Sequence, residues 1–578
     1  MVEELTQLDP ELQMLLNNKQ SGFNYRKRRE EDWLENYTLY RDKVTINRLT
    51  QRQSVNIPLM KQTVRTLLKD VDDLPVLYFE NLDNDKEKEI FQNGYWELTG
   101  DKDHNNFELL DIIDKRQVFL FGRSFDQWQI ANGQIKVIIQ DPQDILVSRY
   151  TDPTNIHTSR FLIHTHIFKT LAELENNPDY DQQAVKRLKT WYGTEMGIIK
   201  VASNQEMAVE KNKKMEEMGV PDVDSPVLGE TIVELTMHFI KRQEKDEDEQ
   251  IWLYVEVDDR EIIMKKPLEE VIGTTEDHFW RTHFPYNSWA DDIERQDFWS
   301  DGIGDMVRTP NKILNSWFSQ LVENRTLRNF GMHYYDSTVE GFMPSSFNPV
   351  HWGWYGVPGK PQDVLQKVDI PDLSESLDEM KFLLEVNEKA TGATATQQGV
   401  QTERQVTLGE VQLALGEAKE RVKGMSKFYT TAWQQRGRMF LKLIEAAHGR
   451  LEAVKIYKKG RNTDKLFERE VSPKDWMTKS GYREKVWSQD EKKSQDSESI
   501  QKLNAAVAVM PDNPKLLEVY QRKLLQFSDL TPEEITSIME YEQQKREQIL
   551  NQIQAGGMMG QPMGQQPMPT QPTMPIQR

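Results

Sequence analysis

The spacing of hydrophobic and polar residues predicts a body that mixes helices with strands. Apolar side chains recur at helical intervals through residues 23–70, whereas residues 107–268 begin with a helix and continue into alternating segments typical of strands. Asn132 and Gly133 separate two of these segments, and an Asn-Gly pair in that position favours a tight β-hairpin turn. Residues 170–218 are charged and helical in pattern, so we expect an α+β fold that is predominantly helical.

In the second half of the chain, two predicted helices flank an irregular segment. Residues 303–329 show a strong amphipathic pattern, and residues 374–390 show a second one with apolar positions on one side. Between them, residues 330–372 contain many Gly and Pro residues among aromatic side chains and short β-like runs. We expect a small irregular or β-rich excursion inserted between two helices.

The longest predicted helix follows. Apolar residues recur at alternating steps of four and three from Val411 to Leu443, so the helix covers roughly residues 402–448 and about 70 Å. It ends near Gly449, a residue type that favours helix C-termini. A helix of this length needs neighbours along its whole length, either from its own chain or from other copies.

The rest of the chain is predicted to hold a short β-containing segment, further helices and a tail of low complexity. Residues 451–490 carry the β-like pattern. Residues 555–578 consist largely of Gly, Met, Pro and Gln, a composition that cannot form a hydrophobic core. We expect this tail to be disordered unless a partner orders it.

Charge and composition narrow the classes of function. The chain has 578 residues, with 73 Lys and Arg against 93 Asp and Glu, and its formal net charge is −20. This balance disfavours a protein that holds nucleic acid along a broad basic face, although it is compatible with one that lets nucleic acid pass without adhering. Cysteine is absent, which excludes disulfides and thiolate metal sites. No apolar run is long enough to span a bilayer and the N-terminus lacks a basic, apolar signal segment, so no membrane partner is expected.

No catalytic or cofactor motif is complete. Gly302 and Gly304 resemble the start of a dinucleotide-binding loop, but Val307 occupies the position of the required third glycine. Gly359 and Lys360 likewise lack the rest of a phosphate-binding loop. We therefore expect no enzymatic activity and no cofactor.

Three groups of polar residues are candidate ligands or contacts. His164 and His166 would lie on one face of a strand as a metal pair, but no third ligand is adjacent and an exposed strand is favoured. The acidic clusters Asp246–Glu249 and Asp291–Glu294 lack the spacing of a known cation-binding loop, so solvated loops are favoured. The run Arg26–Arg29 could touch phosphates, but acidic residues follow it at once and a solvated helix face is favoured. No metal site is expected.

Two further stretches are candidate contact sites. The aromatic cluster of Trp352, Trp354 and Tyr355 lies in the Gly- and Pro-rich excursion, where exposed aromatic residues often anchor a partner. Local packing of a small β unit is an equal alternative for this cluster. Residues 391–402 join two strong helices through small or neutral polar residues, and a plain surface connector would satisfy that pattern.

The order of these parts resembles the portal, or head-to-tail connector, proteins of tailed bacteriophages, particularly those of short-tailed phages. The similarity spans roughly residues 20–500 and rests on that order and on two stretches, FWSDGIGDMVRTPNKILNSWFSQLVENR and EVNEKATGATATQQG…TERQVTLGEV. It implies a portal-like subunit with wing, stem, clip and crown regions that assembles into a ring, usually a dodecamer.

The resemblance assigns a role to each part of the chain. The implied regions are a wing (1–300), a stem helix (301–329), a clip (330–372), a second stem helix (373–390), a tunnel loop (391–402), a long wing helix (403–449), a crown with C-terminal helices (450–554) and a disordered tail (555–578).

In this scheme, the tunnel loop narrows the channel through which DNA moves. Small uncharged side chains can form transient hydrogen bonds to DNA without the tight phosphate binding of Lys or Arg; here they are Thr394, Thr396, Gln397, Gln398 and Gln401. Gly392 and Gly399 would let the loop change shape. The resemblance also implies that the clip residues Trp352, Trp354 and Tyr355 contact tail adaptor proteins.

The implied function is a non-enzymatic viral conduit at one vertex of a capsid. Double-stranded DNA is packaged and ejected through such a ring, the terminase motor and then the tail attach to it, and the major capsid and scaffolding proteins surround it. The expected location is the virion, after assembly in the host cytoplasm. Two alternatives stay open: a helical scaffold or adaptor that assembles through residues 403–449 as a coiled coil, and a metal-dependent nuclease that uses the acidic clusters.

Overall fold

The structure is a computed structural model. It describes residues 9–42, 46–47, 52–53, 55–70, 74–194, 232–243, 248–329, 333–338, 340, 360, 362, 365–367, 369–373, 376–391, 408–459, 466–478 and 481–487. The chain divides into two units, Met1–Ile456 with Arg469–Gln489, and Tyr457–Glu468 with Asp490–Arg578. We call the first the body unit.

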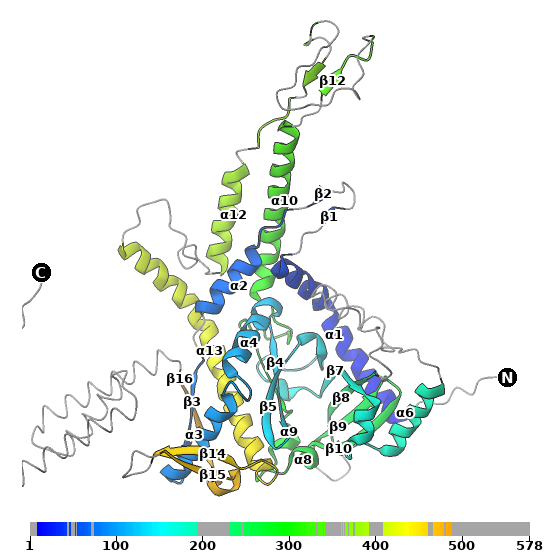
Figure 1. Cartoon of the computed structure of the whole chain (residues 1–578), viewed down its shortest axis with the longest axis vertical. Helices are drawn as coiled ribbons and strands as arrows, with labels where there is room; N and C mark the ends of the chain where they lie inside the picture. The colour runs from blue at the N-terminus through cyan, green and yellow to red at the C-terminus, as the bar shows by residue number, and fades with distance from the viewer. Residues whose placement is uncertain are drawn as a thin grey trace, which may run out of the picture. The chain divides into compact units, whose positions relative to one another are not determined.

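Helices and strands are both abundant in the described residues, which confirms the predicted mixture of α and β structure (Figure 1). The helices are α1 (Pro10–Arg41), α2 (Leu59–Asp70), α3 (Lys86–Gly100), α4 (Phe107–Phe121), α5 (Leu171–Asn176), α6 (Gln182–Thr194), α8 (Leu268–Ile272), α9 (Phe279–Thr282), α10 (Ile303–Asn329), α12 (Ser376–Thr391), α13 (Leu408–Ala447) and α14 (Pro473–Trp476). The strands are β1 (Ile46–Asn47), β2 (Arg52–Gln53), β3 (Val76–Asn81), β4 (Ser124–Ala131), β5 (Gln134–Gln140), β6 (Ile145–Val147), β7 (Phe161–Thr170), β8 (Ile232–Arg242), β9 (Gln250–Val257), β10 (Glu261–Pro267), β11 (Tyr286–Trp289), β12 (His333–Tyr335), β13 (Leu365–Lys367), β14 (Val454–Lys459), β15 (Leu466–Val471) and β16 (Tyr482–Trp487).

A five-stranded antiparallel sheet in the order β10-β9-β8-β7-β6 forms one layer of the body unit. Both faces of its central strands are buried. The face toward α1 carries polar residues, and there the buried Lys19 donates to Thr236 and Glu256 at 3.1 and 3.3 Å. Leu15 and Phe23 of α1 pack on one face, where they meet Phe161 of β7. The other face meets β11, and there the ring centres of Phe239 and Tyr286 lie 5.5 Å apart.

A three-stranded antiparallel sheet in the order β11-β4-β5 packs against that layer. Its β4–β5 hairpin turns at Asn132 and Gly133, whose φ angles of 52° and 71° lie in the left-handed region, so the predicted hairpin is confirmed. Asn105 covers the outer edge of β5, because its side-chain amide bonds to the carbonyl of Ile135 and to the N–H of Val137, both at 3.0 Å. This side chain occupies hydrogen-bonding groups that would otherwise attract another strand.

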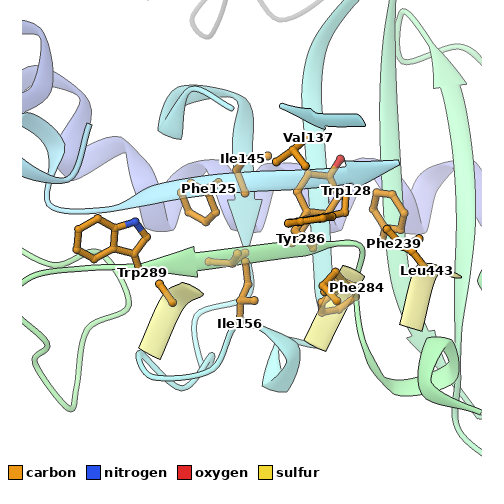
Figure 2. Close-up of a cluster of buried hydrophobic side chains, with 14 of the residues drawn as sticks. Phe125, Trp128, Val137, Ile145, Ile156, Phe239, Phe284, Tyr286, Trp289 and Leu443 are labelled. Carbon is orange, nitrogen blue, oxygen red and sulfur yellow. The ribbon is translucent and has the colours of Figure 1, made fainter. Parts of the chain in front are cut away.

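Aromatic and aliphatic side chains from both sheets and from α13 form the core between them. Figure 2 shows Phe125 and Trp128 of β4 near Tyr286 of β11, with Phe239 of β8 and Leu443 of α13 at one end of the cluster. Full burial of a side chain of this size contributes roughly 1.5–3 kcal/mol. The cluster therefore holds the two sheets and α13 together as one core.

The segment between α1 and α2 differs from the helix predicted through residues 23–70. Helix α1 ends at Arg41 because Asp42 adopts a left-handed conformation, with φ 56° and ψ 42°. Three amide N–H groups beyond it donate to polar side chains of α10: Val55 to Ser319, Ile57 to Asn315 and Met60 to Asn311, at 3.1, 2.7 and 2.9 Å. These acceptors recur every four residues, so they lie in one row along α10 and hold the segment in place. No local pattern in residues 42–58 reveals this contact.

Residues 451–490 contain strands, as predicted, but one of them pairs with a strand far away in sequence. β16 pairs antiparallel with β3, and Trp487 lies opposite Val76. Just before β16, the buried indole of Trp476 donates to the side chain of Gln92 in α3 at 2.8 Å. A segment that follows α13 in sequence thus completes the body unit.

None of the helices in the described part of the chain combines the length and the apolarity that a membrane crossing requires.

Candidate functional site

The contact residues predicted from the sequence lie outside the residues that the structure describes. They are Thr394, Thr396, Gln397, Gln398 and Gln401 of the loop, and Trp352, Trp354 and Tyr355 of the excursion. The described elements that flank them are α12 and α13 for the loop, and β12 and β13 for the excursion. The candidate site is therefore built from these flanking elements and from α10.

Helices α10 and α12 form a pair that extends away from the sheets of the body unit (Figure 1). In the first half of α10, Ile303, Val307 and Leu314 are buried, whereas Val322 in the second half is exposed. α12 runs back beside α10, and Met380 on its inner side is buried. β12 and β13 pair antiparallel beyond the far end of α10. Both predicted helices and, in its described part, the β character of the excursion are confirmed.

Polar contacts join the far end of α10 to the segment that leads into α12. Near the far end, the side-chain amide of Asn324 donates to the carbonyl of Pro371 at 3.1 Å, and Arg328 pairs with Asp372 at 2.7 Å. Exposed ion pairs of this kind contribute little stability. The position of the helix pair therefore depends on apolar packing, in which Met380 is buried, and on the contacts at the base of α10.

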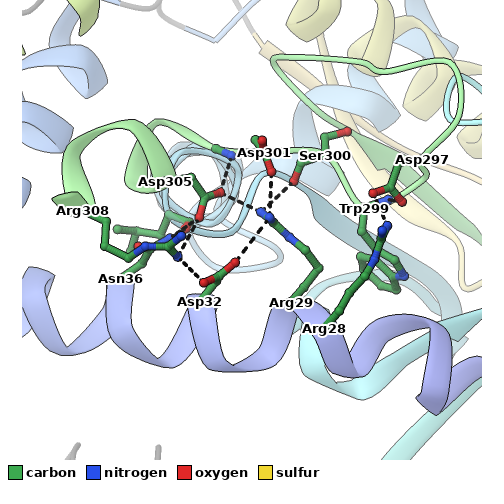
Figure 3. A network of polar contacts seen from close by, with 12 residues as sticks. Arg28, Arg29, Asp32, Asn36, Asp297, Trp299, Ser300, Asp301, Asp305 and Arg308 are labelled. Atoms are coloured by element: carbon green, nitrogen blue, oxygen red, sulfur yellow. Dashed lines mark hydrogen bonds and ion pairs between the residues drawn. The ribbon is translucent and has the colours of Figure 1, made fainter.

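An ion-pair network fixes the first turns of α10 to α1 (Figure 3). Arg29 of α1 contacts Asp301 at 2.7 Å and Asp305 at 2.6 Å, while Arg308 of α10 contacts Asp32 of α1 at 2.7 Å. Burial would lower the pKa of Arg29, but the facing carboxylates of Asp305 and Asp301 outweigh it and raise that pKa. The network stays charged and ties the base of the helix pair to the body unit.

A close approach of glycines places the start of α10 on the end of α4. Gly122 has a φ of 81°, and a Cβ atom there would lie 2.0 Å from the carbonyl oxygen of Ser300. A Cβ atom on Gly302 would lie 2.7 Å from the nitrogen of Gly122, and the N–H of Gly302 donates to Asp305 at 2.9 Å. Gly304 is equally close to α4. The glycines that resembled a dinucleotide-binding loop therefore serve close packing.

Only part of the basic run Arg26–Arg29 is the solvated helix face that its sequence favoured, since Lys27 and Arg28 are exposed but Arg26 and Arg29 are not. Arg26 is 1% exposed, pairs with Glu30 at 2.7 Å and donates to the carbonyl of Ile145. Arg29 belongs to the network at the base of α10, and the half-exposed Arg28 pairs with Asp297. The expectation was wrong for Arg26 and Arg29 because α1 lies across the sheet and against α10, which buries one side of the run.

A groove lies between the far half of α10 and the segment that leads into α12. It has a volume of about 990 Å³ and is lined by Phe318, Leu321, Val322, Asn324, Arg325, Arg328, Asn329, Asp369, Ile370, Asp372 and Leu377. Its wall thus combines apolar side chains with two arginines and two aspartates. Arg325 forms no ion pair with any residue that the structure describes.

The outer side of α12 carries an apolar ridge, defined here as Phe382 and Val386. Phe382 is 68% exposed and Val386 is 41% exposed, and residues four apart are neighbours on a helix surface. Phe382 lies two residues from the buried Met380, which places it about 200° around the helix from the inner side. Three carboxylates lie on this helix near the ridge: Asp378, Glu379 and Glu385. The sequence pattern predicted one apolar side for this helix, and the four-residue spacing of Phe382 and Val386 is the signal that indicates a second.

Helix α13 is anchored to the body unit by a buried charge. The guanidinium of Arg436 contacts Asp114 of α4 at 2.8 Å and Asp126 of β4 at 2.9 Å. Burial opposes this charge, but the two carboxylates outweigh it and raise the pKa of Arg436. The indole of Trp289 also donates to Asp114 at 2.8 Å, so the anchor joins α13 to α4, β4 and β11.

The histidines of β7 are buried, so the exposed strand expected for them was wrong. His164 shares a hydrogen bond of 2.9 Å with the hydroxyl of Tyr286, and His166 contacts Asp144 at 2.8 Å. The sheet is covered on both faces, and a shift in register between His164 and Ile167 interrupts simple alternation. Within the described ranges, no group of three or more His, Asp or Glu residues could hold a metal ion.

Asp291 departs from the solvated loop expected for Asp291–Glu294. Its side chain is buried, and its Oδ1 atom has no hydrogen-bond partner. Burial raises the pKa of Asp291 to about 7. Asp292 and Glu294 are exposed, as are Asp248 and Glu249 of the other acidic cluster, so the expectation holds for these residues. Asp246 and residue 247 lie outside the described residues.

No protein-family model matches the sequence, and comparison with curated proteins finds no relative.

Proposed function

We propose that the chain is the subunit of a portal-type conduit, a ring through which double-stranded DNA enters and leaves a viral capsid. The observation that carries the proposal is the helix pair α10 and α12, which extends away from the sheets of the body unit and holds the paired strands β12 and β13 at its far end. A pair of helices suits the wall of a channel, and a β-rich tip at its end suits contact with a further ring of proteins. In this proposal, residues 301–329 and 373–390 are the stem and residues 330–372 are the clip.

The anchoring of the helix pair supports a mechanical role. Arg29, Asp305 and Arg308 tie its base to α1, and Gly122 and Gly302 bring it against α4 without intervening side chains. A channel wall must keep its position relative to the body while DNA moves past it. A base held by ion pairs and by backbone contact meets that requirement better than a hinge would.

The charge of the chain supports passage of DNA rather than its retention. A net charge of −20, repeated around a ring, repels a polyanion and limits adhesion to the wall. The proposed tunnel loop, residues 391–402, adds uncharged side chains such as Gln397 and Gln398. The proposed partners are further copies in a dodecameric ring, the terminase, the tail adaptors, and the major capsid and scaffolding proteins. The proposed location is a vertex of the virion, after assembly in the host cytoplasm.

The burial of α13 disfavours the alternative of a coiled-coil scaffold. Tyr429, Trp433 and Phe440 on the second half of α13 are all buried within the body unit, and Arg436 between them is paired with two carboxylates. A coiled coil would need this apolar face free for a second helix. That half of α13 is already occupied by its own chain.

Electron microscopy of the purified full-length protein tests the ring directly. We expect top views with an open centre and approximately twelve-fold symmetry. Rods, compact dimers, or monomers that persist across salt and concentration would overturn the proposal.

A charge change in the tunnel loop tests the contact with DNA. The double variant Gln397→Lys with Gln398→Lys is expected to retain DNA on the rings at low salt and to release it as salt rises, because added lysines bind phosphates. A matched variant, Gln182→Lys with Gln183→Lys, adds the same two charges at an exposed pair of glutamines on α6 and should leave retention at the wild-type level. Equal DNA binding by wild-type and loop-variant rings would argue against a loop that faces DNA.

A further inference from the structure

We infer that the apolar ridge of one copy, Phe382 and Val386 of α12, docks into the groove between α10 and α12 of the next copy. The inference rests on the proposed ring, since it names the surfaces through which neighbouring subunits meet. A single copy leaves two features open to solvent. The side chain of Phe382 is 68% exposed, and the groove has a volume of about 990 Å³ and apolar side chains in its wall.

The two surfaces are complementary in polarity. Phe318, Leu321 and Val322 line the groove and offer an apolar floor to Phe382. Aromatic side chains that fill such pockets carry much of the binding free energy in protein interfaces. Val386, one turn further along α12, extends the same apolar contact.

They are also complementary in charge. The groove is lined by two arginines and two aspartates, and Arg328 pairs with Asp372 at 2.7 Å. Arg325 forms no ion pair with any described residue, so it is the cation that a carboxylate of another copy can meet. The helix that carries the ridge presents the exposed carboxylates Glu379 and Glu385, whereas Asp378 pairs with Lys381 of the same helix at 3.5 Å. When the ridge of one copy approaches the groove of another, carboxylates and guanidinium groups are brought to the same rim. Charge pairs at a rim favour the correct partner and its orientation.

The placement of the two surfaces determines the kind of assembly. Leu377 lines the groove and lies three residues from Met380 on the inner side of α12, whereas Phe382 lies on the outer side. A copy that offers its ridge to a neighbour therefore directs its groove away from that neighbour. Two copies alone leave one ridge and one groove unfilled. Only a head-to-tail series fills them all, and such a series ends when it closes into a ring.

Two point variants test the ridge and the groove separately. Phe382→Asp removes the ridge and Val322→Asp removes the groove floor, and both side chains are exposed enough in the single copy that folding should not depend on them. Each variant alone should raise the protein concentration at which rings form by at least about tenfold, as expected for an interface hot spot. Mass photometry measures the assembled fraction, and thermal melting followed by circular dichroism checks that each subunit folds. Tyr150→Asp, at an exposed aromatic outside the helix pair, is the matched control and should assemble like the wild type.

Mixing the two variants tests whether the ridge of one copy binds the groove of another. The Phe382→Asp copy keeps its groove and the Val322→Asp copy keeps its ridge, so an equimolar mixture can make one complete joint. We expect 1:1 heterodimers and no rings. A mixture that stays monomeric, or a Phe382→Asp protein that forms rings at the wild-type concentration, would overturn the inference while the proposed ring stands. Absence of rings from the wild-type protein would instead count against the proposed function itself.

Discussion

Arg436 contacts the carboxylates of Asp114 and Asp126 at 2.8 and 2.9 Å, and all three side chains are buried. At the scale of single residues, this makes its replacement a sharp test of the fold. Removal of one partner from a buried ion pair leaves an uncompensated charge and costs roughly 3–5 kcal/mol. We expect Arg436→Leu to lower the free energy of unfolding of the body unit by that amount, measured by urea denaturation. Arg438→Leu, on the exposed side of the same helix, should change it by less than about 0.5 kcal/mol. Equal losses in the two variants would show that the charge pairs are not what anchors α13.

Asp291 makes the stability of the body unit depend on pH, with the opposite sign to the effect of a paired carboxylate. Burial raises its pKa from 3.8 to about 7, so the folded protein holds a proton that the unfolded chain releases. Its contribution to stability is therefore fully present below pH 3.8 and is lost as the pH rises through about 7. We expect Asp291→Asn to stabilise the protein at pH 8, by at most about 4 kcal/mol, and to have little effect at pH 4. Urea unfolding at both pH values measures this, and a variant effect that is equal at both would contradict the assignment.

Residues of this kind could not be placed from the sequence, because burial at a single position is set by segments far away in the chain. Arg26 and Asp291 both stand in charged runs, and a charged run usually faces solvent. Arg26 is covered because α1 lies across the five-stranded sheet, and Asp291 because the loop after β11 turns into the core. Phe382 is the opposite case, an apolar residue that the fold of one copy leaves exposed.

At the scale of elements, the contact between α4 and the start of α10 depends on Gly122. Its φ of 81° is costly for any residue with a Cβ atom, and that atom would lie 2.0 Å from the backbone oxygen of Ser300. Gly122→Ala should therefore lower the melting temperature clearly, with a loss of at least about 2 kcal/mol. Gly449→Ala is the control, because a Cβ atom there meets nothing within 4 Å, and it should cost less than about 1 kcal/mol. Differential scanning fluorimetry measures the melting temperatures. Similar values for the two variants would mean that α10 can move away from α4 without loss of stability.

Elements with strong local signals were predicted well, and elements that depend on distant partners were not. The periodic pattern of α10, the return helix α12 and the Asn-Gly turn between β4 and β5 lie within their own segments, so the sequence contains the information needed. The pairing of β16 with β3 joins residues about four hundred positions apart, and no local pattern specifies it. The extended segment before α2 was mistaken for helix because its hydrogen-bond acceptors, Asn315 and Ser319, belong to α10.

At the scale of the whole molecule, the order of parts along the chain was sufficient to suggest a conduit. The surfaces through which copies would meet could be identified only in the folded subunit. The ridge and the groove become complementary once α10 and α12 lie side by side, since each surface uses residues whose exposure depends on that packing. The proposed tunnel loop and clip are still predictions from sequence, because their residues lie outside those that the structure describes. The assembly is thus best tested through the helix pair.

Strand β16 follows α13 in sequence and pairs within the body unit, which allows a prediction about where the body unit ends along the chain. β16 pairs with all six residues of β3, and Tyr482 and Val486 pack against the main core beside the buried Leu77 and Phe79. A chain cut after Gln489 keeps this strand and should melt at the same temperature as the body unit of the full-length protein. A chain cut after Thr478 loses it and exposes apolar surface, at a cost of at least about 2 kcal/mol. Thermal melting of the two truncated proteins, with size-exclusion chromatography to detect aggregation, distinguishes them. If both melt alike, β16 is dispensable, and if the longer one fails to fold, the body unit depends on residues beyond its own boundary.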